Sequence, residues 1–203
     1  MTPSRTETLV RVGKPLVFLL CLAPMGHLLW RVVMETIGAN PVETLIHATG
    51  DWTLRLLLIT LAVTPLRRLT GQVWLIRFRR QLGLFAFFYA CLHLTAYLWL
   101  DQFFDWRAII EDIVKRPYIT VGFAAFVLLI PLAVTSTRGW TRRLGRRWKT
   151  LHRVVYFIAI LGVVHYLWLV KADRFEPILY GVILAGLLAF RIPWRKGNQS
   201  GVN

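Results

Sequence analysis

Two histidines, His93 and His165, each sit inside an apolar stretch of about twenty residues, 81–100 and 151–170. An imidazole in hydrocarbon is costly unless a partner satisfies it. The neutral ring is also the commonest side-chain ligand of metals. Two such residues at one level of a membrane would therefore suit a shared ligand, and a haem iron is the leading candidate.

The depth of each histidine can be counted from the basic residue that precedes its span. His93 lies 13 residues beyond Arg80 and His165 lies 12 residues beyond Arg153, which is about 20 Å and about 18 Å of helix. Matched depth is what axial ligation of one haem iron by two histidines requires. The alternative is that each histidine only forms a hydrogen bond with a neighbouring helix.

The elements that must position these residues are membrane helices. The 203 residues are 56% hydrophobic and have a mean hydropathy of +0.54. A helix needs about 20 apolar residues to cross a bilayer. We therefore predict one all-α domain over residues 1–203, an integral membrane bundle of six helices. The predicted spans are 15–34, 45–66, 81–100, 118–135, 151–170 and 177–191, and the first is expected to be retained rather than cleaved as a signal peptide.

Charge predicts the orientation of these spans, because loops rich in Lys and Arg stay in the cytoplasm. Segments 67–80 and 136–149 are strongly basic and contain no acid, whereas eight of the ten acidic residues fall in the opposite loops. The tails 1–14 and 192–203 are then both cytoplasmic. Topology and anionic lipid account for the net charge of +15, so no nucleic-acid partner is expected.

His152 is predicted to lie near the cytoplasmic surface, about 20 Å from His165 along one helix. It cannot ligate the same iron. A second haem at its level would need a partner near Arg79 and Arg80, where no histidine occurs, although a single-ligand site stays open. Those arginines and His152, beside Trp148 or Trp74, would alternatively offer cations and an aromatic ring to a flavin. An interfacial histidine that contacts headgroups is the simplest reading.

Other polar residues within the predicted spans could have a structural or a functional role. His27 and His47 are expected to be structural, His27 satisfied within the bundle and His47 close to water. The alternative for His27 is a contact with the haem or a hydrogen bond to a quinone. Asp51 and Arg55 are spaced i to i+4, which permits a local ion pair. Their alternative role is contact with a haem propionate or a quinone.

Several classes of function are excluded by what the sequence lacks. Cys21 and Cys91 are isolated, so covalent c-type haem, a zinc knuckle and a thioredoxin-like centre are not expected. No glycine-rich dinucleotide fingerprint follows a strand, so NAD(P)H is not expected to bind here. No nucleophile–base constellation occurs either, which places substrate chemistry in another protein.

A series of motifs along the chain resembles the MsrQ (YedZ) family. These motifs are Thr64–Arg67 (TPLR), Arg79–Gly83 (RRQLG), His93, Thr135–Ser136, Trp148–Arg153 (WKTLHR) and His165–Trp168 (HYLW). That family is the haem-binding membrane subunit of a bacterial periplasmic methionine sulfoxide reductase system, with a ferric reductase-like transmembrane domain. The resemblance covers essentially the whole chain.

The resemblance implies cofactors, partners and a direction of electron flow. His93, His152 and His165 match the family's haem-associated histidines, with a b-type haem, and FMN is a further cofactor of the family. Electrons would come from the quinone pool or a cytosolic flavin reductase and reach a periplasmic molybdopterin-containing subunit that reduces methionine sulfoxide in oxidised proteins. The outer segment Asp101–Arg116 is our predicted docking site for that subunit.

Two other functions are compatible with the same residues. The chain could anchor a different quinone-linked oxidoreductase as a cytochrome b. It could also be a transporter or structural membrane protein whose histidines relay protons or only pack.

Overall fold

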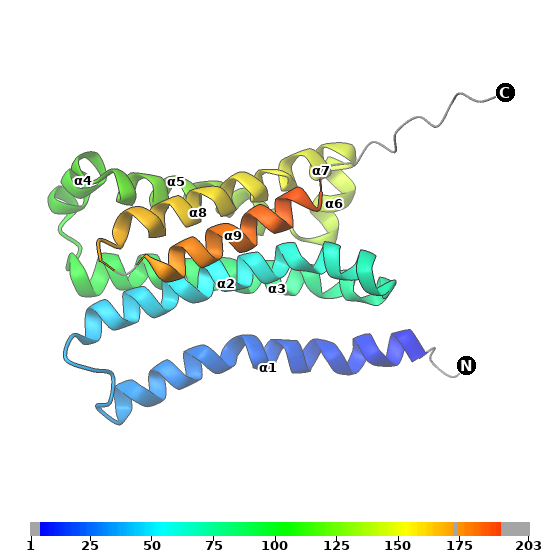
Figure 1. The fold of residues 1–203 in the computed structure, drawn as a ribbon, viewed down its shortest axis with the longest axis horizontal. Coiled ribbons are helices and arrows are strands. Elements are labelled where there is room, and N and C mark those ends of the chain that lie inside the picture. The colour runs from blue at the N-terminus through cyan, green and yellow to red at the C-terminus, as the bar shows by residue number, and fades with distance from the viewer. Residues whose placement is uncertain (1–4, 173, 192–203) are drawn as a thin grey trace.

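The computed structural model describes residues 5–172 and 174–191, and this part of the chain is helical throughout its regular elements. Six long helices form a bundle (Figure 1). They are α1 (Arg5–Val33), α2 (Pro41–Thr70), α3 (Arg79–Ala96), α5 (Pro117–Val134), α8 (Val154–Leu169) and α9 (Phe175–Ala189). Shorter elements connect them: η1 (Val73–Phe78), η2 (Tyr97–Asp101), α4 (Trp106–Lys115), α6 (Arg138–Leu144) and α7 (Arg146–His152). The predicted all-α membrane bundle is confirmed.

The predicted spans and the observed helices differ mainly at their ends. The first helix begins at Arg5, so much of the predicted tail 1–14 is helical, while the predicted tail 192–203 lies outside the described residues. The predicted span 151–170 was drawn as one helix, but α7 ends at His152 and α8 begins at Val154. This break separates the basic segment from the apolar one.

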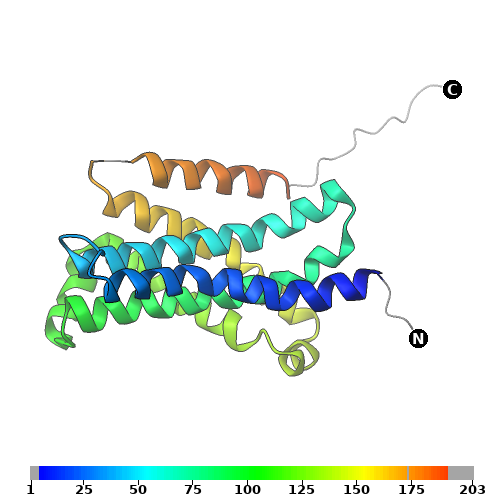
Figure 2. The same cartoon turned by 90° about the horizontal axis from the view of Figure 1, so that it is seen from below.

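Membrane character is strongest in four helical segments of the described chain. Thr6–Val33, Val73–Asp101, Pro117–Val134 and Arg146–Leu169 are long and apolar enough to cross a bilayer. The remaining two long helices depart from that standard for different reasons: α2 carries charged residues within its length, and α9 has 15 residues. Both pack beside α8 in the bundle (Figure 2).

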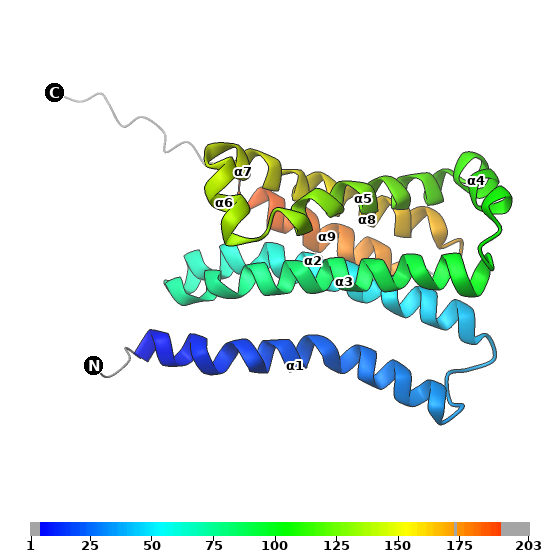
Figure 3. The same ribbon diagram turned by 180° about the vertical axis from the view of Figure 1, so that it is seen from behind.

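The connections place like charges together at the two ends of the bundle. The start of α1, the turn from α2 through η1 to α3, and helices α6 and α7 lie at one end, and α4 lies at the other (Figures 1 and 3). The two basic segments identified in the sequence, 67–80 and 136–149, therefore share one end. This arrangement agrees with the alternation on which the predicted topology rests.

Helix α1 is joined to α3 by two hydrogen bonds that share one tyrosine hydroxyl. The hydroxyl of the fully buried Tyr89 on α3 donates to the carbonyl of Cys21 at 2.8 Å and accepts from the backbone N–H of Met25 at 3.0 Å. Cys21 and Met25 are an i, i+4 pair, next to Pro24 inside the helix. Proline interrupts the helical hydrogen-bond ladder, and a side chain inserted at such a point fixes the local bend.

The outer connection contains a short amphipathic helix, α4. Asp105 caps it by accepting hydrogen bonds from the N–H groups of Arg107 and Ala108 at 3.0 and 3.1 Å, as N-cap carboxylates do. The preceding Phe103 and Phe104 have φ values of 47° and 59°, a region that L side chains disfavour. The chain therefore turns sharply between α3 and α4, where the sequence had indicated only a loop.

Candidate functional site: a histidine pair in the outer half of the bundle

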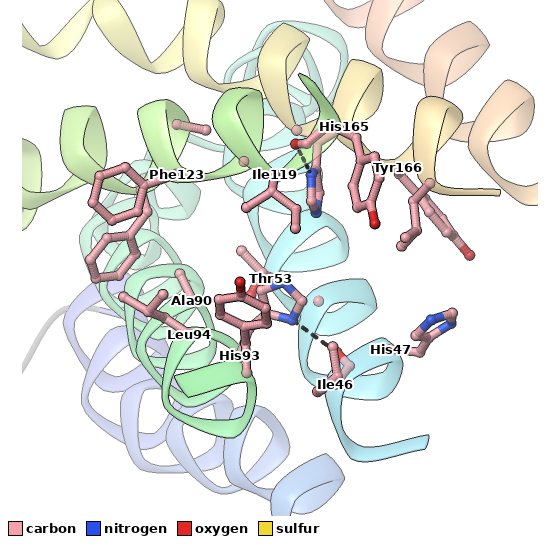
Figure 4. Close-up of a pocket in the computed structure, with 18 of the residues that line it drawn as sticks. Ile46, His47, Thr53, Ala90, His93, Leu94, Ile119, Phe123, His165 and Tyr166 are labelled. Atoms are coloured by element: carbon pink, nitrogen blue, oxygen red, sulfur yellow. Dashed lines mark hydrogen bonds between the residues drawn. The ribbon is translucent and has the colours of Figure 1, made fainter. Parts of the chain in front are cut away.

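The rings of His93 on α3 and His165 on α8 lie close together, with centroids 6.1 Å apart and planes inclined at 80°. Figure 4 shows them approaching from different helices across a cavity. An imidazole nitrogen sits about 2 Å from a bound metal and about 1.2 Å from its own ring centre, so two rings on opposite sides of one ion have centres roughly 6 Å apart. The observed separation fits one metal ion between the rings.

Each ring is held in place by its own hydrogen bond through Nδ1. His93 Nδ1 lies 2.9 Å from the carbonyl oxygen of Ile46, and His165 Nδ1 lies 2.6 Å from that of Tyr118. A carbonyl only accepts, so each Nδ1 carries the proton and donates it. The tautomer that results leaves Nε2 unprotonated on both rings, which is the form that binds a metal.

Two glycines allow the rings to approach the neighbouring helices. A Cβ on Gly122 of α5 would lie 2.7 Å from His165 Nδ1 and 2.8 Å from its Cε1. A Cβ on Gly50 of α2 would lie 3.1 Å from the corresponding atoms of His93. The ring of His165 therefore occupies space that a side chain at position 122 would fill, and the ring of His93 packs tightly against Gly50.

The two rings line a cavity of about 660 Å³ between α2, α3, α5 and α8, within the usual range of roughly 300–1,000 Å³ for cofactor sites. Its deep wall is apolar and includes Leu57, Ala90 and Phe126. Helix α4 covers the outer side of the cavity with Ile109 and Ile113. The space is therefore largely apolar inside and bordered by a short helix at its outer end.

Polar groups gather at the outer rim of the cavity, where Arg116 is the main cation. Its Nε lies 3.1 Å from Asp112 Oδ1. A hydrogen bond with Tyr118 raises the pKa of Arg116 above its usual value, so its charge is permanent. A planar apolar macrocycle with two carboxylates needs two axial nitrogens, an apolar slot and a cation at the rim. The residues present therefore fit a haem.

The aromatic and small residues close to the histidines in the sequence lie in two places. Tyr97, Gly162 and Tyr166 line the cavity. In contrast, Tyr89 turns towards α1, and Trp168 is exposed on α8. Counting along a helix indicated depth correctly but did not indicate which face of the helix each residue occupies.

His152 lies apart from the histidine pair and does not belong to the cavity lining. Its Nε2 is 3.1 Å from the hydroxyl of Thr135, and the Trp148 ring stacks on it with centroids 4.0 Å apart. The Trp148 indole donates to the carbonyl of Thr135 at 2.9 Å. Trp148, rather than Trp74, is thus the aromatic neighbour of His152.

The two arginines predicted beside His152 differ in their surroundings. Arg79 is half-buried and close enough to His152 to act on it electrostatically, and Arg80 is exposed. Two other histidines are exposed as well. His47 reaches the rim of the cavity. The expectation that His27 is satisfied within the bundle is wrong, because its side chain lies on the exposed face of α1.

Sequence reasoning missed the groups that hold the histidines in place. The carbonyls of Ile46 and Tyr118 carry no side-chain signal, and the glycines were recognisable only as helix-contact residues. The helix α4 did have a signal, since Asp105 precedes an alternation of apolar and charged residues with helical spacing. In the structure Ile109 is buried against the bundle, whereas Trp106 and Ile110, which are four residues apart, are exposed on another face of the helix.

The fold and the histidine pair agree with a family comparison. Residues 49–163 match the family model described as "Ferric reductase like transmembrane component". The chain therefore belongs to a class of membrane proteins built on this helical domain, and the matched segment contains Gly50, His93, Gly122 and His152.

Closer relatives define the family within that class. The chain is 56% identical over 193 residues to the protein-methionine-sulfoxide reductase heme-binding subunit MsrQ of Herminiimonas arsenicoxydans, covering 94% of this chain and 88% of the relative. It is 55% identical over 199 residues to MsrQ of Xanthomonas axonopodis pv. citri (strain 306), covering 95% and 91%. This protein is a member of the MsrQ family. No solved structure matches it.

Proposed function

We propose that this protein is a haem-binding, electron-transferring membrane subunit of a protein-methionine-sulfoxide reductase system. The observation that carries the proposal is the histidine pair, with its 6.1 Å ring separation and both Nδ1 atoms bonded to carbonyls. His93 and His165 would hold a b-type haem iron through Nε2. Bound there, the haem supplies one-electron redox chemistry, and the chain's own residues orient it and exclude water.

The names of the relatives support a partner within a methionine sulfoxide reductase system. Their names describe the heme-binding subunit of a protein-methionine-sulfoxide reductase. We propose that a periplasmic molybdopterin-containing subunit receives the electrons and reduces methionine sulfoxide in oxidised proteins. It would dock at the outer segment Asp101–Arg116, where Phe103 and Trp106 are 80% and 62% exposed.

The proposal also includes the orientation of the bundle in the membrane and the source of the electrons. The basic end of the bundle would face the cytoplasm of a bacterial inner membrane, with both termini on that side. Electrons would enter from the quinone pool or a cytosolic flavin reductase. His152, Arg79 and Arg80 would belong to a site at the basic end for FMN or a second haem, supported by the stacked Trp148 ring and the neighbouring cation.

The test is the haem content of the purified protein and of single variants. Protein made with ample haem should show b-type bands in a reduced-minus-oxidised spectrum. His93→Ala and His165→Ala should each lose nearly all haem, whereas His27→Ala, a matched change on the exposed face of α1, should retain it. A colourless wild-type protein would support the competing class, a transporter or structural membrane protein.

A further inference from the structure

A second polar cluster lies beside the haem cavity, between α2, α8 and α9. Arg55 Nε donates to the Tyr180 hydroxyl at 2.7 Å, and Arg55 Nη2 lies 3.8 Å from Asp51 Oδ2. The Tyr166 hydroxyl donates to Glu176 Oε2 at 2.9 Å. Ionisable groups in the apolar part of a membrane protein are expensive, and they usually mark a functional path.

The cluster contains flat surfaces as well as charges. The Tyr166 and Tyr180 rings stack with centroids 6.1 Å apart, and the Arg55 guanidinium lies over the Trp52 ring at 5.3 Å. Aromatic rings and a guanidinium plane of this kind bind planar rings by stacking. The donors and the carboxylates around them can satisfy polar substituents on such a ring.

Two sides of the cluster connect it to different environments. Asp51 and Tyr166 also line the haem cavity, so the cluster shares a wall with it. On α9, Ile178, Leu179 and Val182 are 54%, 42% and 65% exposed, on the same turns as Tyr180. These apolar side chains face the bilayer, while the Arg55 and Asp51 side chains are 35% and 21% exposed. The cluster is therefore partly exposed at the surface of the bundle on one side and adjoins the haem site on the other.

We propose that this cluster binds the headgroup of a membrane quinol, the electron donor of the proposed function, on which this inference rests. A quinol has a planar ring, two polar substituents and an apolar tail, which match the stacking surfaces, the polar side chains and the exposed apolar face of α9. Arg55 and Tyr180 hold one oxygen of the ring. The carboxylates of Asp51 and Glu176 accept the hydroxyl protons.

The chemistry balances at this position. Oxidation of one quinol to the quinone breaks two O–H bonds and releases two electrons and two protons. A haem held by His93 and His165 would accept these electrons one at a time, across the wall formed by Asp51 and Tyr166. The protons pass to Asp51 and Glu176, and then to water at the outer surface, where Glu176 is exposed. On this route the electrons enter the protein at the end of the bundle that contains the histidine pair.

The first test is direct labelling, which needs no turnover. The haem-loaded protein in lipid nanodiscs is irradiated with an azido-ubiquinone, and the labelled peptides are mapped. Label on α2, α8 or α9 within the cluster is expected, and an excess of decylubiquinone should remove it. Arg55→Met should reduce this labelling at least about 10-fold, and Arg11→Met, a matched change at an exposed position of α1, should leave it unchanged.

The second test is the rate at which decylubiquinol reduces the haem in the absence of other proteins. Arg55→Met and Glu176→Gln should slow this reduction at least about 10-fold, with normal haem content and normal reduction by dithionite. Equal rates in wild type and variants, or label only at the basic end, would overturn the quinol site and leave the haem site intact. Loss of haem from Arg55→Met would also overturn it, because Arg55 would then hold the haem. A wild-type protein without haem would refute the proposed function itself.

Discussion

Replacing Gly122 by alanine adds one methyl group directly against the ring of His165. The new Cβ would lie 2.7 Å from Nδ1, 2.8 Å from Cε1 and 3.1 Å from Cγ, whereas carbon atoms in good contact are about 3.5–4.0 Å apart. The ring must therefore move by roughly 1 Å. It cannot do so and keep the 2.6 Å hydrogen bond from Nδ1 to the Tyr118 carbonyl.

The size of the effect follows from the loss of that support. Groups that orient a metal-binding histidine contribute about 10- to 100-fold to affinity, and a displaced ring also shifts Nε2 off the axis of the iron. We expect Gly122→Ala to weaken haem binding by at least about 10-fold. Gly50→Ala should have a smaller effect, because its Cβ would lie 3.1 Å from His93.

The assay is a haemin titration of apoprotein in detergent, followed by absorbance, with haem per protein as a second readout. Gly186→Ala is the matched control, since nothing lies within 4 Å of its Cβ position. Alanine in place of a helical glycine adds about 0.5–1 kcal/mol of helix stability, so a loss at Gly122 cannot come from lower helix propensity. Wild-type haem affinity in Gly122→Ala would refute the reasoning.

Three further predictions concern other parts of the molecule. Tyr89→Phe removes the hydroxyl between Cys21 and Met25 and should cost about 1–3 kcal/mol of stability; an unchanged thermal midpoint in detergent would show that the hydroxyl does not anchor α1. His152→Ala should lose part of the haem or none, as haem per protein will report, and complete loss would mean that His152 supports the outer site. Alanine at both Phe103 and Trp106 should slow electron delivery to the reductase subunit at least about 10-fold without changing haem content, and unchanged delivery would exclude this docking surface.

The histidine pair was predictable because it depends on two properties that the sequence carries directly. Hydrophobic length and loop charge gave the direction of each helix, and the rise per residue turned sequence position into depth. His93 and His165 then fell at one level, and the structure brings their rings together. His152 fell elsewhere, and the structure places it against Thr135 and Trp148 instead.

The rest of the site depends on rotation and packing, which one sequence without a fold does not specify. The faces occupied by Tyr89 and Trp168 are set by neighbouring helices, so their closeness to the histidines in the sequence does not bring them into the site. The roles of Gly50 and Gly122 appear only when the opposite helix is in place, since a glycine has no side chain to indicate its contact. The break between α7 and α8 was also missed, because Arg153 continues an otherwise unbroken helical pattern.

The most direct test of the central claim is the electron paramagnetic resonance spectrum of the ferric, haem-loaded protein. Two imidazoles on one iron make it low-spin, and ring planes inclined at 80° should give a strongly anisotropic low-spin signal that disappears in His93→Ala and in His165→Ala. A high-spin signal in the wild-type protein, or a low-spin signal that survives either substitution, would contradict a haem shared by His93 and His165.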